Sequence, residues 1–232
     1  MSKIFAIGDI HGCHRQLVAL LGRLPLDRAE DTLVFLGDYI NRGPDSRRVL
    51  DTLIGLQRNC RRAVFLKGNH EQALLDYDPD SGPSGLSLLR AMGIEATAES
   101  YGVPLGRLAD LSCMPPEHQQ FLFDLRLNFT CDGFFFTHAD FDPAPPATTV
   151  ATIDETPRQR MRRRQAEARL LISRRLGREE NLQPPPPWTV IFGHLTHATP
   201  LVRPDRIGID TGAVYGNLLT AVQLPQRIFY HA

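Results

Sequence analysis

The sequence has few cysteines and no long hydrophobic run. Its four cysteines form neither a CxxC pair nor a zinc-ribbon spacing, so they predict free thiols in a reducing compartment. No apolar stretch is long enough to span a bilayer, and no signal peptide precedes the first predicted strand. We therefore expect a cytoplasmic protein that does not bind membranes.

The chain also has no net charge and almost no lysine. The 26 basic and 26 acidic residues balance, and Lys3 and Lys67 are the only lysines. This balance provides no bulk electrostatic attraction to nucleic acid. The length of 232 residues, 42% of them hydrophobic, allows a sizeable core in one domain or at most two. We expect a monomer.

The first third of the chain alternates predicted strands and helices. Apolar runs over 4–7, 32–36 and 63–66 predict buried strands, and leucine-rich helical spacing predicts helices over 14–24 and 46–56. A β-α-β-α-β order predicts a largely parallel sheet that binds ligands at the carboxyl ends of its strands.

The remainder predicts a second group of strands. Apolar runs over 125–130 and 134–138 flank Asp132-Gly133, which is a hairpin turn signal. A strand is predicted over 189–192, and the tail predicts short antiparallel strands. An arginine-rich helix is predicted over 157–177.

Short runs rich in Asp, Asn and His follow the predicted strands. Three of them are Gly8-Asp9-Ile10-His11-Gly12, Gly37-Asp38-Tyr39-Ile40-Asn41-Arg42-Gly43 and Gly68-Asn69-His70-Glu71, and two later ones are Thr137-His138-Ala139-Asp140 and Gly193-His194. Carboxylates and imidazoles suit manganese, iron or zinc, and the glycines let the backbone come close to a site. Because strand order can bring these runs together, six candidate metal ligands stand out: Asp9, His11, Asp38, Asn69, His138 and His194.

This combination predicts a site for two metal ions. A dinuclear site needs one carboxylate that bridges two cations and terminal ligands on each side, and such sites usually hydrolyse phosphate esters. Any one of these residues alone is more often a helix cap, a turn residue or a buried polar group. The prediction of a metal-dependent phosphatase depends on their joint occurrence.

The order of the motifs resembles the phosphoprotein phosphatase branch of the metallophosphoesterases, whose pattern is GDxHG, GDxxDRG, GNHE, HA(G/D) and GH. All five motifs occur in order between Gly8 and His194, and residues 206–215 also resemble bacterial members. The resemblance implies one domain over residues 1–232, an α/β four-layer sandwich with two mixed β-sheets flanked by helices. It also implies a serine/threonine protein phosphatase acting on a phosphorylated protein or peptide, with phosphotyrosine as a further substrate.

The resemblance assigns roles to individual residues. A hydroxide bridging the two metals would attack phosphorus in line, with no phosphoenzyme. His70 would be the general acid, and Arg42 and Asn69 would bind phosphate oxygens. Two divalent ions are implied, manganese first with iron or zinc as alternatives. One ion would be held by Asp9, His11 and Asp38, and the other by Asp38, Asn69, His138 and His194, with Asp38 bridging.

One position departs from the family pattern. The second Asp of GDxxDRG is Asn41, and in the family that carboxylate favours the imidazolium form of the general acid. An amide can orient His70 but supplies no negative charge. We therefore expect a general acid that is weakly charged at neutral pH and an activity optimum shifted to lower pH.

Two further substrate contacts come from looser matches. The stretch 170–174 is the nearest match to the family segment that carries a second phosphate-binding arginine, which assigns Arg174, although the family's Trp is absent. Tyr215 either lies near the metals, as in the family, or covers the core. A solvated helix face is the plain alternative for the arginine-rich run. The other candidate arginines are Arg162, Arg163, Arg164, Arg169 and Arg175.

Two other functions stay open. A diadenosine tetraphosphate hydrolase belongs to a related branch with the same metals, but its third motif usually reads GNHD, so Glu71 favours the protein phosphatase. A catalytically weak module that binds phosphorylated ligands is an alternative of a different class. Asn41 favours such a module, whereas the complete set of six ligands argues against it.

Overall fold

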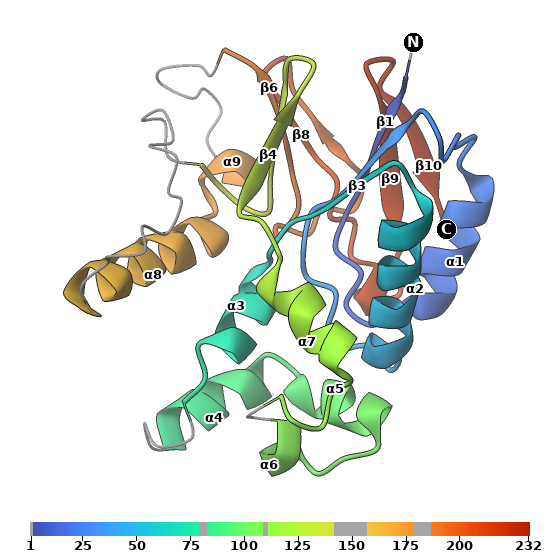
Figure 1. The fold of residues 1–232 in the computed structure, drawn as a ribbon. Coiled ribbons are helices and arrows are strands. Elements are labelled where there is room, and N and C mark those ends of the chain that lie inside the picture. Colours follow the sequence, from blue (N-terminus) through green and yellow to red (C-terminus); the bar gives the residue numbers. More distant parts are fainter. Residues whose placement is uncertain (1, 79–82, 109–110, 142–156, 179–186) are drawn as a thin grey trace.

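The computed structural model describes residues 2–78, 83–108, 111–141, 157–178 and 187–232. Within these ranges, ten strands form two five-stranded sheets with helices on their outer faces (Figure 1). Both sheets contain parallel and antiparallel pairs. The predicted α/β sandwich of two mixed sheets flanked by helices is confirmed.

The first sheet is built around the N-terminal strand β1 (Ile4–Ile7). It pairs in parallel with β2 (Thr32–Phe35), which pairs in parallel with β3 (Arg62–Phe65). On its other side β1 pairs antiparallel with β9 (Thr220–Leu224), which is followed by β10 (Ile228–His231). Because the central strands are covered on both faces, they are continuous apolar runs rather than alternating ones.

The second sheet begins with the predicted hairpin. Its turn residues Asp132 and Gly133 have φ of 49° and 81°, the positive values that a tight type I′ hairpin requires. Strand pairing begins three residues later than predicted, at Asn128. In spatial order the strands are β4 (Asn128–Cys131), β5 (Phe134–Thr137), β6 (Thr189–Phe192), β8 (Arg206–Gly208) and β7 (Leu201–Val202).

Alternation along β1 shows how the layers pack. Phe5 and Ile7 belong to the core between the first sheet and its helices, whereas Ile4 and Ala6 belong to the core between the two sheets. A third cluster, which includes Val190 of β6, fills the outer face of the second sheet. The outer layers come from α1 (His14–Arg23), α2 (Ser46–Asn59), α3 (Asn69–Leu75), α4 (Pro83–Ala91), α5 (Ile94–Tyr101), α6 (Leu105–Leu108), α7 (Pro116–Phe123), α8 (Pro157–Leu171) and α9 (Arg175–Arg178).

The arginine-rich helix predicted over 157–177 is two helices, because the helical conformation is interrupted between α8 and α9. Ser173 lies in the break, donates its hydroxyl to Asp140 at 2.5 Å and accepts the backbone N–H of Arg175 at 3.3 Å. All four cysteines are free, as predicted. In the described parts of the chain, no helix has both the length and the apolar character needed to cross a bilayer.

Candidate metal centre

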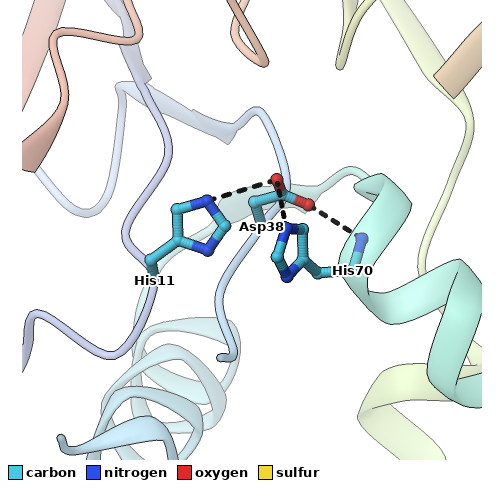
Figure 2. A group of neighbouring side chains, drawn as sticks. All are labelled: His11, Asp38 and His70. Atoms are coloured by element: carbon cyan, nitrogen blue, oxygen red, sulfur yellow. Dashed lines mark hydrogen bonds and ion pairs between the residues drawn. The ribbon is translucent and has the colours of Figure 1, made fainter. Parts of the chain in front are cut away.

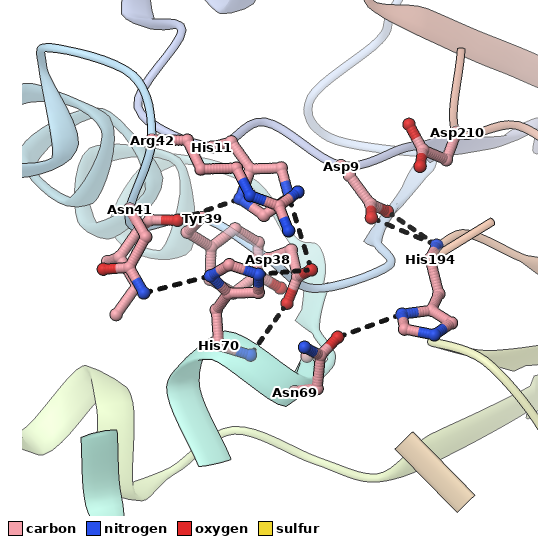
Figure 3. A network of polar contacts seen from close by, with 12 residues as sticks. Asp9, His11, Asp38, Tyr39, Asn41, Arg42, Asn69, His70, His194 and Asp210 are labelled. Atoms are coloured by element: carbon pink, nitrogen blue, oxygen red, sulfur yellow. Dashed lines mark hydrogen bonds and ion pairs between the residues drawn. The ribbon is translucent and has the colours of Figure 1, made fainter. Parts of the chain in front are cut away.

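The six predicted metal ligands come together where the strands of both sheets end. Three motifs follow the parallel strands β1, β2 and β3, and two follow the parallel strands β5 and β6. Figure 3 shows side chains from these loops and from the start of α3 pointing into one shared region. The buried or nearly buried members include Asp9, His11, Asp38 and His138.

The loops that carry these side chains have an unusual backbone. The angle φ is 44° at His11, 52° at Asp38, 71° at Asn41, 68° at Arg42 and 64° at His194. Such conformations cost on the order of 1–3 kcal/mol for a residue with a side chain, and they cluster at functional sites. Here they turn the chain sharply at the sheet edge, which directs neighbouring side chains toward one point.

Two glycines leave room for the carboxylates. A Cβ atom added to Gly68 would overlap the carboxylate of Asp38, and one added to Gly193 would overlap the carboxylate of Asp9. Both positions therefore exclude any larger residue. This explains the glycines that precede Asn69 and His194.

Asp38 lies at the middle of the cluster. Its Oδ2 atom lies 3.4 Å from Nε2 of His11 and 3.9 Å from Nε2 of His70 (Figure 2). The same oxygen lies 3.6 Å from Nε2 of His138. Two groups of ligand atoms, each within 4.8 Å of one another, share this carboxylate: His11, Asp38 and His70, and Asp38, His138 and His194. A shared carboxylate is the geometry that a bridging ligand requires.

The imidazole protons show what the centre can bind. Nδ1 of His138 donates to the backbone oxygen of Leu36 at 2.9 Å, and burial lowers the pKa of His138 to about 4, so Nε2 holds a lone pair. That lone pair faces the amide oxygen of Asn69 at 3.0 Å. The same oxygen lies 3.0 Å from Nδ1 of His194. With Oδ1 in this position two acceptors face each other, and a cation between them would satisfy both; with the amide turned over, Nδ2 would donate to Nε2 of His138.

The buried carboxylates also indicate that the centre can bind cations. Burial, Asp210 and Asp38 together raise the pKa of Asp9 well above its usual value, and burial raises the pKa of Asp38 to about 7. Carboxylates this crowded are unfavourable as anions unless a cation lies among them. Oxygen and imidazole donors suit manganese, iron or zinc, so the residues present fit two divalent ions. Asp9 also accepts the backbone N–H of His194 at 3.1 Å.

Glu71 shapes the loop that carries Asp38, a role that the motif letters alone did not reveal. Its Oε1 accepts the N–H groups of Tyr39 and Ile40 at 2.8 and 3.2 Å. Its Oε2 accepts those of Asp38 and Gly68, each at 3.0 Å. This fully buried carboxylate therefore joins two of the ligand-bearing loops.

Asn41 holds the ring of His70. Its Nδ2 donates to Nδ1 of His70 at 3.0 Å, and its Oδ1 accepts the hydroxyl of Thr97 at 2.8 Å. Thr97 in turn accepts the backbone N–H of Asn41 at 2.9 Å and lies 3.0 Å from the hydroxyl of Ser46. In this arrangement Thr97 donates its proton to the amide oxygen and the amide presents its NH₂ group to His70; Ser46, 3.0 Å from Thr97, is the alternative acceptor of that proton. Nδ1 of His70 therefore holds a lone pair, and the ring proton is on Nε2.

Arg42 and Tyr215 lie together at the exposed edge of the centre. An Arg42 guanidinium nitrogen donates to Nε2 of His11 at 3.0 Å. Its Cζ atom lies 5.5 Å from the ring centre of Tyr215, whose side chain is 61% exposed. Tyr215 therefore lies over Arg42 and does not cover the core.

The candidate arginines of α8 and α9 differ in their partners. Arg174 is exposed, and its charge contributes to lowering the pKa of His194, after the larger effects of burial and His138. Arg175 instead binds Asp140 with Nη2–Oδ1 and Nε–Oδ2 distances of 2.5 and 3.1 Å. Two others form ion pairs: Arg164 lies 3.7 Å from Asp76, and Arg163 pairs with Glu167 at 2.8 Å. Arg169 is exposed, and the side chain of Arg162 lies outside the described part of the chain.

Two pockets adjoin the centre. One, of about 460 Å³, includes Asn69 and otherwise has mainly apolar walls from α3, α4 and α8. The other, of about 740 Å³, includes Arg42 and is lined by further basic groups, among them Arg15 and Arg23 of α1. Figure 3 shows Arg42 and Asn69 on different sides of Asp38.

Comparison with known proteins places this geometry in a family. Residues 2–213 match the family model described as calcineurin-like phosphoesterase. A stretch of 72 residues is 43% identical to "Bis(5'-nucleosyl)-tetraphosphatase, symmetrical" of Delftia acidovorans, which covers 31% of this chain and 25% of the relative. The matched stretch thus spans a quarter of the length of that curated relative.

Solved structures share the fold. A candidate diadenosine tetraphosphatase superposes with a TM-score of 0.66 at 23% identity, covering 100% of this chain and 93% of that one. A cold-active protein-tyrosine phosphatase of a psychrophilic Shewanella species superposes with a TM-score of 0.64 at 18% identity, covering 96% and 75%. At these identities the likeness shows the fold and nothing finer.

The predicted phosphoprotein phosphatase activity and the predicted phosphorylated protein partner are wrong. The curated relatives are named for hydrolysis of nucleotide tetraphosphates. The physical reason for the error is that the five motifs describe a metal centre, which attacks phosphorus in many substrates, and do not describe the surfaces that choose among them.

Proposed function

Because the chain belongs to the calcineurin-like phosphoesterase family, we propose that it hydrolyses dinucleoside tetraphosphates, with diadenosine tetraphosphate as the reference substrate. The named relatives support this substrate class. Symmetrical cleavage would release two nucleoside diphosphates. The diadenosine tetraphosphate hydrolase, which the sequence analysis kept as an alternative, thus replaces the protein phosphatase as the proposed function.

The observation that carries the proposal is the contact between Asn41 and His70. With an amide N–H at Nδ1 and burial lowering the pKa of His70, the ring is neutral at pH 7. A neutral imidazole is a poor acid for an alkoxide, which is about as basic as hydroxide (water has a pKa of about 15.7). A nucleoside diphosphate leaves as a weakly basic phosphate anion, for which the second pKa is about 6. The site therefore suits cleavage of a phosphoanhydride better than cleavage of a phosphoserine ester.

The proposed roles of the ligands follow from the centre. Two divalent ions, manganese first with iron or zinc as alternatives, would supply a hydroxide nucleophile and positive charge at phosphorus. Asp38 would contact both, and Glu71 keeps its loop in place through four N–H groups. The remaining ligands would be Asp9, His11, Asn69, His138 and His194.

The proposed substrate contacts come from residues at the edge of the centre. Arg42 would bind non-bridging phosphate oxygens through its planar guanidinium. The proton on Nε2 of His70 would form a hydrogen bond to the leaving oxygen, with Asn41 orienting the ring. Arg174 and Tyr215 would contact more distant parts of the substrate, since both are exposed beside the centre.

The two pockets support a substrate that extends in two directions from the attacked phosphorus. The pocket beside Arg42 carries basic residues that suit a polyphosphate chain. The pocket beside Asn69 is apolar, so a phosphate group does not suit it. A single phosphate ester on a protein loop would need neither.

The resemblance to the phosphoprotein phosphatase branch concerns the metal centre. Glu71 of the GNHE motif positions the loop of Asp38, a task that is independent of the leaving group. We therefore infer that the resemblance to that branch reflects the architecture of the metal centre. The substrate class depends instead on the pockets beside the centre. The cytoplasmic location is part of the same proposal.

The test compares two substrates. Metal-stripped protein is incubated with diadenosine tetraphosphate or a phosphothreonine peptide, with and without manganese, and with Asp38→Asn as the control. We expect turnover of the dinucleotide that needs manganese and disappears in the variant. Turnover of the peptide with no turnover of the dinucleotide would overturn the proposal.

A further inference from the structure

The pocket beside Asn69 has the size and position of a ligand subsite. Its volume of about 460 Å³ lies within the range of small-molecule sites, roughly 300–1,000 Å³. Asn69 belongs both to this pocket and to the metal centre, where its Oδ1 lies 3.0 Å from Nε2 of His138. A ligand that occupies the pocket therefore lies beside a residue of the candidate metal centre.

The walls of the pocket suit a flat, apolar group. They include Tyr77 of the segment after α3, Met92 at the end of α4, and Ala168 of α8. Leu88 and Ile172, which are 57% and 58% exposed, add two large aliphatic side chains to the lining. Aromatic and thioether side chains make favourable contacts with a heteroaromatic ring.

One polar residue of the lining carries a buried acceptor without a partner. Gln72 is 5% exposed, and its Oε1 atom has no hydrogen-bond partner within the described part of the chain. Its Nε2 atom donates to Asp76 at 2.6 Å. A buried acceptor without a partner is unfavourable; Oε1 is closed to solvent in this conformation, so the N–H donor of a ligand reaches it when the Gln72 amide turns toward the pocket.

We propose that this pocket binds a purine base that carries an exocyclic amino group, as one nucleoside arm of the substrate. The inference rests on the proposed function and adds the recognition of the base. The amino group would donate to Oε1 of Gln72, the ring would lie between the apolar walls, and the phosphate chain would run past Asn69 to the metal centre. The basic pocket beside Arg42 then receives the rest of the polyphosphate.

The steric test uses a matched pair of substitutions on α8. Ala168→Trp fills the pocket, whereas Gln165→Trp places the same side chain at an exposed position of α8 that does not line it. The manganese-loaded proteins are assayed with diadenosine tetraphosphate and with inorganic tetraphosphate, which has no base. We expect Ala168→Trp to lower the ratio of the two kcat/KM values at least about tenfold, and Gln165→Trp to leave it unchanged. An unchanged ratio in Ala168→Trp would overturn the inference.

The chemical test concerns the amino group. The wild-type protein should prefer diadenosine tetraphosphate over diinosine tetraphosphate, which has a carbonyl oxygen in place of the amino group, by about tenfold. Gln72→Leu should abolish this preference and keep the apolar wall. A preference that persists in Gln72→Leu would contradict recognition by Gln72.

A binding measurement separates this inference from the proposed function. If the wild-type protein hydrolyses no dinucleotide, the proposed function fails, but calorimetric titration with adenosine diphosphate still examines the pocket. Binding that Ala168→Trp weakens at least about tenfold, and that Gln165→Trp does not change, supports the base subsite. No binding by the wild-type protein, or equal binding by all three proteins, contradicts it.

Discussion

Nδ2 of Asn41 lies 3.0 Å from Nδ1 of His70, so an amide and not a carboxylate orients this imidazole. The hydroxyl of Thr97 fixes the amide by donating to its oxygen at 2.8 Å. Burial lowers the pKa of His70 and keeps the ring neutral, and with the amide NH₂ at Nδ1 the ring proton lies on Nε2. This arrangement links one position of the chain to the leaving groups that the site can expel.

Asn41→Asp should widen the range of leaving groups. Burial, His11 and Arg42 lower the pKa of His70, and a carboxylate at Nδ1 would oppose this by favouring the imidazolium form. Because the wild-type ring is already neutral, we expect the variant to gain a limb in its pH–rate profile that follows the His70 imidazolium, with the pKa of His70 raised by about one pH unit or more. We also expect kcat/KM for a phosphothreonine peptide, relative to diadenosine tetraphosphate, to rise about tenfold. An unchanged profile and an unchanged ratio would remove the role given to Asn41.

Thr97→Val should affect both stability and activity. The substitution keeps the shape of the side chain but leaves the amide oxygen and the backbone N–H of Asn41 without this partner. We expect a loss of about 1–3 kcal/mol in the free energy of unfolding and a lower kcat with KM little changed. Thr52→Val is the matched control, since Thr52 pairs with His14 away from the centre and is only half-buried. Equal urea-unfolding curves for Thr97→Val and wild type would contradict this prediction.

Metal affinity should depend on pH through the carboxylates. Burial raises the pKa of Asp38 to about 7, so below pH 7 this carboxyl must release a proton before it binds a cation. Burial lowers the pKa values of His11 and His138 to about 3 and 4, so these ligands are already neutral. Apparent manganese affinity should therefore rise by about tenfold or more per pH unit toward pH 7, and the raised pKa of Asp9 adds to this rise. Calorimetric titrations that show a constant affinity between about pH 5.5 and 7 would contradict this account.

Asp38→Asn should abolish activity and stabilise the metal-free protein. The raised pKa of Asp38 means that its contribution to stability is favourable below about pH 4 and is lost as the pH rises through about 7. An amide removes this unfavourable charge at pH 8, and its oxygen can still accept the N–H of His70, now 3.1 Å from Oδ1. In a chelator we expect a melting temperature higher by about 3–6 °C, with the stabilisation by manganese much reduced. A lower melting temperature would show that the carboxylate stabilises the fold.

Two neighbouring arginines should give opposite results. Arg174→Ala should raise KM for the dinucleotide about tenfold and leave stability unchanged, because Arg174 is exposed beside His194. Arg175→Ala should lower the free energy of unfolding by about 2 kcal/mol, because it leaves the buried carboxylate of Asp140 without its main partner. Kinetic assays and urea unfolding of both variants are the measurements. A raised KM in Arg175→Ala and not in Arg174→Ala would contradict this assignment, because it would make Arg175 the substrate contact.

The convergence of the six candidate metal ligands was predictable because each follows a strand in a short polar run. Asp38 and His138, for example, lie at the ends of parallel strands, and such ends meet at one edge of a sheet. The fold was predictable because its buried strands appear in the sequence as short apolar runs. The ends of helices and strands were less predictable. Side-chain contacts such as that of Ser173 with Asp140 interrupt a helix that periodicity alone would continue.

Other residues had no local pattern. Thr97 lies on α5, 56 positions after Asn41, and only the packing of that helix brings the two together. Gln72 and Ala168 share a pocket for the same reason. The substrate prediction failed there, because α4 and α8 lie outside the five motifs. The prediction that residues 1–232 form one monomeric domain stays a prediction.

The most direct measurement of the central claim is hydrolysis of diadenosine tetraphosphate in ¹⁸O-labelled water with manganese, followed by mass analysis of the products. The account predicts adenosine diphosphate as the sole nucleotide product, with one ¹⁸O atom in the terminal phosphate of half of the molecules, because water attacks once per cleavage. Adenosine triphosphate with adenosine monophosphate, or no turnover of the dinucleotide beside turnover of a phosphopeptide, would contradict it.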